Sequence, residues 1–103
     1  MECAAVETPR DLLGTIVISK KGRDKKKPGV ILGWLPGDFA VIADGRLRTV
    51  AKPKKKNMKH LVFTRYRHAE LAVKIENGEQ VTDGMIREGL ASATGVLRSY
   101  GIG

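Results

Sequence analysis

Residues 15–48, with the sequence TIVISKKGRDKKKPGVILGWLPGDFAVIADGRLR, carry the strongest secondary-structure signals of this chain. They contain three apolar runs, which are separated by polar or Pro-Gly segments: residues 15–19, 30–35 and 39–43. In the first run Ile16 and Ile18 should lie on one face and Val17 on the other, because side chains alternate along a strand. The β-branched composition and the turn residues between the runs therefore predict three consecutive β-strands.

The segment that follows predicts two more strands. Asp44-Gly45 is typical of a two-residue type I′ turn, so residues 46–50 should pair back as a fourth strand. Pro53 cannot donate to a sheet and marks a strand end or an edge, whereas residues 60–64 are apolar enough to form a fifth strand. Five short strands joined by tight turns favour a small closed β-barrel over an open sheet, because closure removes the edges.

The last third of the chain changes to helical patterns. Residues 68–76 fit either a strand, since their apolar positions alternate, or a helix that ends at Asn77-Gly78, and we favour the helix. Thr82 is a suitable N-cap for an amphipathic helix over residues 83–99, because apolar side chains recur there near a 3.6-residue period. These side chains are Ile86, Leu90, Ala93, Leu97 and Tyr100.

The chain therefore divides into a flexible N-terminal arm (1–13), a β-barrel (14–66) and a helical C-terminal extension (67–103). Its length of 103 residues fits one such small domain.

The single cysteine, Cys3, excludes a disulfide scaffold, and no apolar run approaches the ~20 residues of a membrane span. The first residues lack the basic start and apolar stretch of a secretory signal, so we expect a cytoplasmic protein.

The positive charge is concentrated in the predicted barrel. The formal net charge of the chain is +8. Residues 14–68 hold ten lysines, five arginines and only three aspartates, while the segments on either side are acidic. Like charges at this density repel one another unless an anion neutralises them, so a polyanion partner is expected. No amphipathic basic helix is evident in the segment, which favours nucleic acid over a membrane surface.

The segment from Gly14 to about Thr64 resembles the KOW module. The loop of that family has the form Gly-x-x-Lys-Gly-x-x-Gly-x-aliphatic after an alternating strand. Gly22, Lys25, Gly29 and Ile31 match it, whereas Lys26 stands where the family has its second glycine. The stretches ADGRLR and KPKKKNMKHL are similar to a bacterial branch related to eukaryotic-type large-subunit ribosomal proteins. This resemblance implies an SH3-like barrel that binds RNA in or near the translation machinery, in association with the ribosome.

The candidate RNA-binding residues lie in two basic segments, 20–29 and 52–60, and in the stretch after Asp44-Gly45. Lysine is a flexible point charge suited to phosphates, so we expect it to grip the backbone of structured RNA, with ribosomal RNA as the expected ligand, rather than read bases. Arg46 and Arg48 should point to one face of the predicted fourth strand. The full set is Lys20, Lys21, Gly22, Arg23, Lys25, Lys26, Lys27, Arg46, Arg48, Lys52, Lys54, Lys55, Lys56, Lys59 and His60.

The aromatic residues are too few for a single-strand binding platform. Phe39 and Phe63 are expected in the core and Trp34 in the core or partly buried. Tyr66 could join the RNA surface or cover the end of the barrel.

Other chemistry has little support in the sequence. The two histidines and Cys3 lack zinc-ligand spacing, so no metal, cofactor or small-molecule substrate is expected, and no catalytic cluster is evident.

The alternative to RNA binding is an SH3-like adaptor for an acidic protein partner. The apolar stripe of the C-terminal helix should pack on the barrel or contact a protein.

Overall fold

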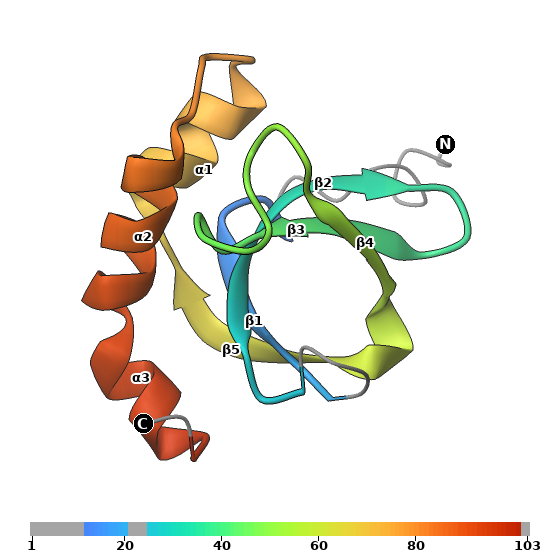
Figure 1. Cartoon of the computed structure of the whole chain (residues 1–103), viewed down its shortest axis with the longest axis vertical. Helices are drawn as coiled ribbons and strands as arrows, with labels where there is room; N and C mark the ends of the chain where they lie inside the picture. Colours follow the sequence, from blue (N-terminus) through green and yellow to red (C-terminus); the bar gives the residue numbers. More distant parts are fainter. Residues whose placement is uncertain (1–11, 21–24, 102–103) are drawn as a thin grey trace, which may run out of the picture.

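The computed structural model describes residues 12–20 and 25–101. Over these residues the chain forms a five-stranded antiparallel sheet followed by helices (Figure 1). The elements are β1 (Thr15–Ser19), β2 (Pro28–Leu35), β3 (Phe39–Ala43), β4 (Lys54–Asn57), the 3-10 helix η3 (Met58–His60), β5 (Leu61–Arg67), α1 (Ala69–Glu76), α2 (Asp83–Ser92) and α3 (Thr94–Ser99).

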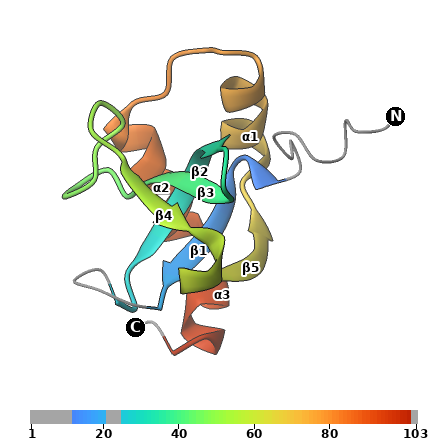
Figure 2. The ribbon, with the colours of Figure 1, turned by 90° about the vertical axis from the view of Figure 1, so that its right-hand side faces the viewer.

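The sheet has the strand order β4-β3-β2-β1-β5. The strands predicted over residues 15–19 and 39–43 are confirmed, and the strand predicted over 30–35 is confirmed with an earlier start. The strand predicted over 60–64 is confirmed as 61–67, because His60 belongs to η3. The sheet curves strongly, with β4 and β5 at its two edges and η3 connecting them (Figures 1 and 2). A five-stranded antiparallel sheet with a helical C-terminal segment is therefore confirmed, and it is consistent with the expected mainly β class.

The prediction of the fourth strand is wrong. Residues 46–50 form no strand, and the fourth strand is Lys54–Asn57, which pairs with β3 in the register Ile42↔Lys54 and Ala40↔Lys56. The Asp44 carboxylate explains the difference, because its Oδ1 accepts 2.9 Å hydrogen bonds from the backbone N–H groups of Arg46 and Arg48. A side chain that captures nearby amides in this way competes with strand pairing.

The loop that replaces the predicted strand is fastened to α2. Arg87 Nη1 donates to the carbonyl of Gly45 over 2.6 Å, and Asp83 Oδ1 accepts from the backbone N–H of Val50 over 2.8 Å. A Cβ at Gly45 would lie 2.6 Å from the carbonyl oxygen of Asp83, and the φ of Gly45 is +79°. The loop can therefore approach α2 only because this residue is glycine.

The helix favoured over residues 68–76 is confirmed as α1. His68 caps it, with Nδ1 accepting from the backbone N–H of Leu71. Leu71 is buried while Val73 is 54% exposed, which is the pattern of a helix and not of a strand with alternating burial. Asn77 ends the helix, and Gly78 follows with a φ of +72°.

The single helix predicted over residues 83–99 is wrong. Thr82 does cap its beginning, but the segment divides into α2 and α3 at Ala93. The N–H of Ala93 bonds to the carbonyl of Leu90, three residues earlier, and the Thr94 hydroxyl donates to the carbonyl of Ala91. These short-range bonds tighten the turn and end the regular i to i−4 pattern.

The core lies on both sides of β1. Ile16 and Ile18 pack with the buried residues of the helical segment, among them Leu71 and Ile86. Val17 faces the other way and packs in a second cluster. That cluster also contains Leu13, Ile31, Ala40, Ile42 and Leu61. The predicted division of the first strand into two faces is therefore confirmed, and the helices form a column along one face of the sheet (Figure 1).

The aromatic side chains differ in part from expectation. Phe39 is not in the core, because it begins β3 beside a turn and is 39% exposed. Phe63 and Trp34 are half-buried against the second cluster, with ring centroids 6.3 Å apart. Tyr66 is half-buried against the cluster that includes the helices, so it covers core residues.

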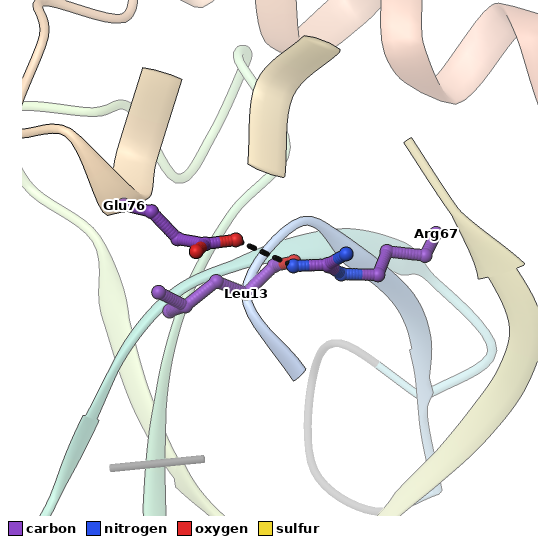
Figure 3. Close-up of polar contacts among 3 residues, drawn as sticks. All are labelled: Leu13, Arg67 and Glu76. Atoms are coloured by element: carbon purple, nitrogen blue, oxygen red, sulfur yellow. Dashed lines mark hydrogen bonds and ion pairs between the residues drawn. The ribbon is translucent and has the colours of Figure 1, made fainter. Parts of the chain in front are cut away.

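Arg67, the last residue of β5, fastens the sheet to neighbouring segments (Figure 3). Its Nε donates to the carbonyl of Leu13 over 2.9 Å, and its Nη2 contacts Glu76 Oε2 of α1 over 2.7 Å.

Of the predicted N-terminal arm, residues 1–11 lie outside the described residues, whereas Leu13 is buried. Within residues 12–20 and 25–101 no helix is long and apolar enough to cross a membrane.

Candidate nucleic-acid interface

The first basic segment connects β1 to β2. The connection is closed by two backbone hydrogen bonds, from Ser19 N to Lys27 O (3.1 Å) and from Lys26 N to Ser19 O (2.7 Å). Lys26 has a φ of +67°, a left-handed backbone conformation that favours glycine. Lys20, Lys25, Lys26 and Lys27 are all exposed. The candidates Lys21, Gly22 and Arg23 lie outside the described residues.

The second basic segment forms an edge of the sheet rather than a loop. The side chains of β4 alternate, so Lys54 and Lys56 lie on the face of their partners Ile42 and Ala40, which belong to the core. Lys55 lies on the opposite face. Basic residues that point inward from an edge strand hinder pairing with another sheet, and this is the structural explanation that competes with a binding role.

The remaining candidates lie around β4. Lys52 precedes it and Lys59 follows it in η3, and both are exposed. His60 is half-buried, and its carbonyl accepts from the backbone N–H of Lys20 over 2.8 Å. This bond joins the start of the first basic segment to the end of the second.

Arg46 and Arg48 do not form the expected two-arginine row. Because the loop of residues 44–50 replaces the strand, the two side chains have different surroundings. Arg46 is exposed and borders a groove of about 540 Å³ between this loop and α2 and α3, where Leu47 is 69% exposed. Arg48 is half-buried and lies at an adjoining hollow, which shares Lys27, Pro28 and Asp44 with this groove.

That hollow brings the basic segments together. It lies where the β1–β2 connection, the 44–50 loop and β4 meet, and its own volume is about 20 Å³. Among the described residues, its lining contains four cationic side chains and one carboxylate. The lining residues are Ser19, Lys27, Pro28, Ile42, Asp44, Arg48, Lys54 and Lys56. We refer to it below as the basic hollow.

Four residues of the basic hollow were not among the candidates: the apolar Pro28 and Ile42, and the polar Ser19 and Asp44. Ser19 and Asp44 both follow or end a predicted strand, and no motif marks either as a ligand-binding residue. The basic hollow groups them with Lys54. The pairing of β1 with β2 and of β3 with β4 produces this grouping, and local sequence does not encode it. The corrected position of β4 is therefore what brings the site together.

Within the described part of the chain no group of three or more His, Cys, Asp or Glu side chains could hold a metal ion. No protein-family model matches the chain, and a search of curated proteins finds no significant match.

Proposed function

We infer that this protein binds structured RNA, and that it does so without catalysis by placing lysine and arginine side chains against the phosphate backbone. The observation that carries the proposal is the basic hollow, where Lys27 of the first basic segment lies beside Lys54 and Lys56 of the second. Segments separated by more than twenty residues thus contribute to one positive surface, as a polyanion would require.

The composition of the surface favours phosphate contacts over base contacts. Lysines outnumber arginines two to one in residues 14–68, and a lysine ammonium offers a point charge without the planar fork that reads guanine. The half-buried Trp34 and Phe63 pack together and do not form an exposed stacking platform. Both features support folded RNA as the ligand.

The fold is compatible with the KOW resemblance. We propose that the curved sheet is an SH3-like barrel of this type, on the strength of the loop residues and of Lys26, whose positive φ is the conformation that glycine adopts most readily. The same resemblance supports a cytoplasmic role at the translation machinery, with ribosomal RNA as the ligand.

The test is RNA binding across a salt series. The double variant Lys25→Gln/Lys54→Gln should bind an RNA hairpin more weakly, with a log–log salt slope lower by roughly 0.7–0.9 for each phosphate that is no longer neutralised. The control Lys74→Gln/Arg98→Gln removes two cationic charges from the helical segment and should leave the slope nearly unchanged. Equal slopes for the two variants would contradict the proposed surface.

The alternative ligand is an acidic protein, for which the same positive surface supplies complementary charge. Protein purified at low salt should carry nucleic acid, seen as a raised ratio of absorbance at 260 nm to that at 280 nm, and high salt should remove it. Purified protein that carries no nucleic acid and does not bind RNA hairpins would favour the adaptor.

A further inference from the structure

The geometry points to a specific site within the proposed RNA surface: the basic hollow receives one non-bridging oxygen of a single backbone phosphate. This inference rests on the proposed function and goes further, because it separates one structured phosphate site from the diffuse attraction of the other lysines. It assigns the site to four cationic side chains and one hydroxyl, those of Lys27, Arg48, Lys54, Lys56 and Ser19.

The size of the hollow selects the ligand. A volume of about 20 Å³ holds one water-sized group, because a site for a single water needs at least roughly 10–15 Å³. A nucleobase or a free nucleotide is far larger. A phosphate on an RNA strand can insert one oxygen while its other atoms stay at the mouth of the hollow.

The charge of the lining selects an anion. The described lining residues include four cationic ones and a serine. Hydrogen bonds from ammonium or guanidinium groups to a phosphate oxygen are charge-assisted, and these are stronger than hydrogen bonds between neutral groups. The one carboxylate, Asp44, has Oδ1 directed to the backbone N–H groups of Arg46 and Arg48 at 2.9 Å. It therefore shapes the loop that carries Arg48, and among the described residues of the lining cationic side chains outnumber carboxylates.

The backbone that carries these side chains is held by hydrogen bonds and strand pairing. Ser19 and Lys27 are joined by the bond that closes the β1–β2 connection. Arg48 is held by Asp44, and its carbonyl accepts from the backbone N–H groups of Asp44 and Gly45. Lys54 is paired with Ile42 in the sheet. An anchored lining reduces the ordering cost of binding, as expected for a built site.

The alternation of β4 provides a matched control. Lys54 and Lys55 are adjacent, both are exposed, and replacement of either by glutamine removes one charge. Lys54 lines the basic hollow, whereas Lys55 lies on the other face of the strand. A general electrostatic attraction depends almost equally on the two lysines, but a phosphate in the hollow depends on Lys54.

The experiment compares Lys54→Gln with Lys55→Gln in the full chain. Affinity for a short RNA hairpin at fixed salt should fall about ten-fold more for Lys54→Gln than for Lys55→Gln, because only the former loses a charged hydrogen bond. In parallel, inorganic phosphate is titrated against chloride at equal ionic strength while the amide resonances of Ser19, Lys27 and Lys54 are followed by NMR. Phosphate should shift them in the parent and in Lys55→Gln but not in Lys54→Gln.

The outcomes separate the two proposals. Equal losses of RNA affinity in both variants, with no phosphate-specific shifts, would overturn the site while RNA binding stands. Phosphate shifts that depend on Lys54 in a protein with no affinity for the hairpin would uphold the anion site and overturn the proposed function. Both variants should fold, because each replaced side chain is exposed on an edge strand. Amide spectra of the free variants that match the spectrum of the parent show that they do.

Discussion

Lys26 shows how one backbone angle shapes the first basic segment. Its φ of +67° is unfavourable for a residue with a Cβ, because the side chain crowds the neighbouring carbonyl groups. The hydrogen bond from its N–H to the carbonyl of Ser19 holds this conformation. The chain therefore has a strained lysine at a position where glycine would be unstrained. This is consistent with a role for the positive charge of Lys26 in binding an anionic ligand.

Replacement of Lys26 by glycine should raise the free energy of unfolding by about 1 kcal/mol, because glycine adopts a positive φ without steric cost. Urea denaturation measures the change. The control is Lys25→Gly, which removes the same charge from the same connection at a residue without a positive φ, and which should not stabilise the protein. A Lys26→Gly variant no more stable than Lys25→Gly would show that the angle carries no strain.

At the scale of elements, the sequence predicts strands where apolar residues alternate and fails where they do not. β1 and β3 have β-branched, alternating sequences and were predicted with their observed bounds. β4 has the sequence KKKN, which has the composition of a loop. Its strand conformation comes from pairing with the free edge of β3, and such tertiary context is not encoded in local propensity.

The same limit explains the wrong hairpin and the partly predicted site. Asp44-Gly45 carries a turn signal, but the residues that fasten the resulting loop to α2, Asp83 and Arg87, lie about forty residues further along the chain. The lysines of the candidate surface could be chosen from the sequence because their density is unusual. The proximity of Lys27 to Lys54 depends on the strand register, so it could not be predicted from the sequence.

The contact between α2 and the 44–50 loop gives a prediction at this scale. Asp83→Ala should lower the free energy of unfolding by roughly 1.5–3 kcal/mol, since Asp83 both accepts from Val50 N and lies in the first turn of α2. Asp83→Asn keeps an oxygen acceptor and should have a smaller effect. Hydrogen exchange at the Val50 amide should accelerate in Asp83→Ala more than in Asp83→Asn. Equal exchange rates in the two variants would show that the carboxylate does not hold the loop.

At the scale of the whole molecule, the sheet and the helices share a core while their charges are divided. Ile16 and Ile18 of β1 pack with Ile86 of α2, so the acidic helical segment covers an apolar face of the basic sheet. The apolar stripe predicted in residues 83–99 thus packs within the chain through Ile86, Ala93 and Leu97. The described residues that line the basic hollow belong to β1, β2 and their connection, to β3, to the 44–50 loop and to β4, and none of them lies in a helix.

This shared core predicts that the described part of the chain unfolds as one cooperative unit. Trp34 packs in the cluster on one side of β1, whereas Ile86 is fully buried in the cluster on the other side. Ile86→Ala should lower the free energy of unfolding by about 2–5 kcal/mol, because it removes buried apolar surface and leaves a cavity. Because β1 belongs to both clusters, the urea midpoints followed by Trp34 fluorescence and by far-UV circular dichroism should coincide and move together. If the helical signal alone moved while the Trp34 transition stayed in place, the helices would be a separate unit docked on an independently stable sheet.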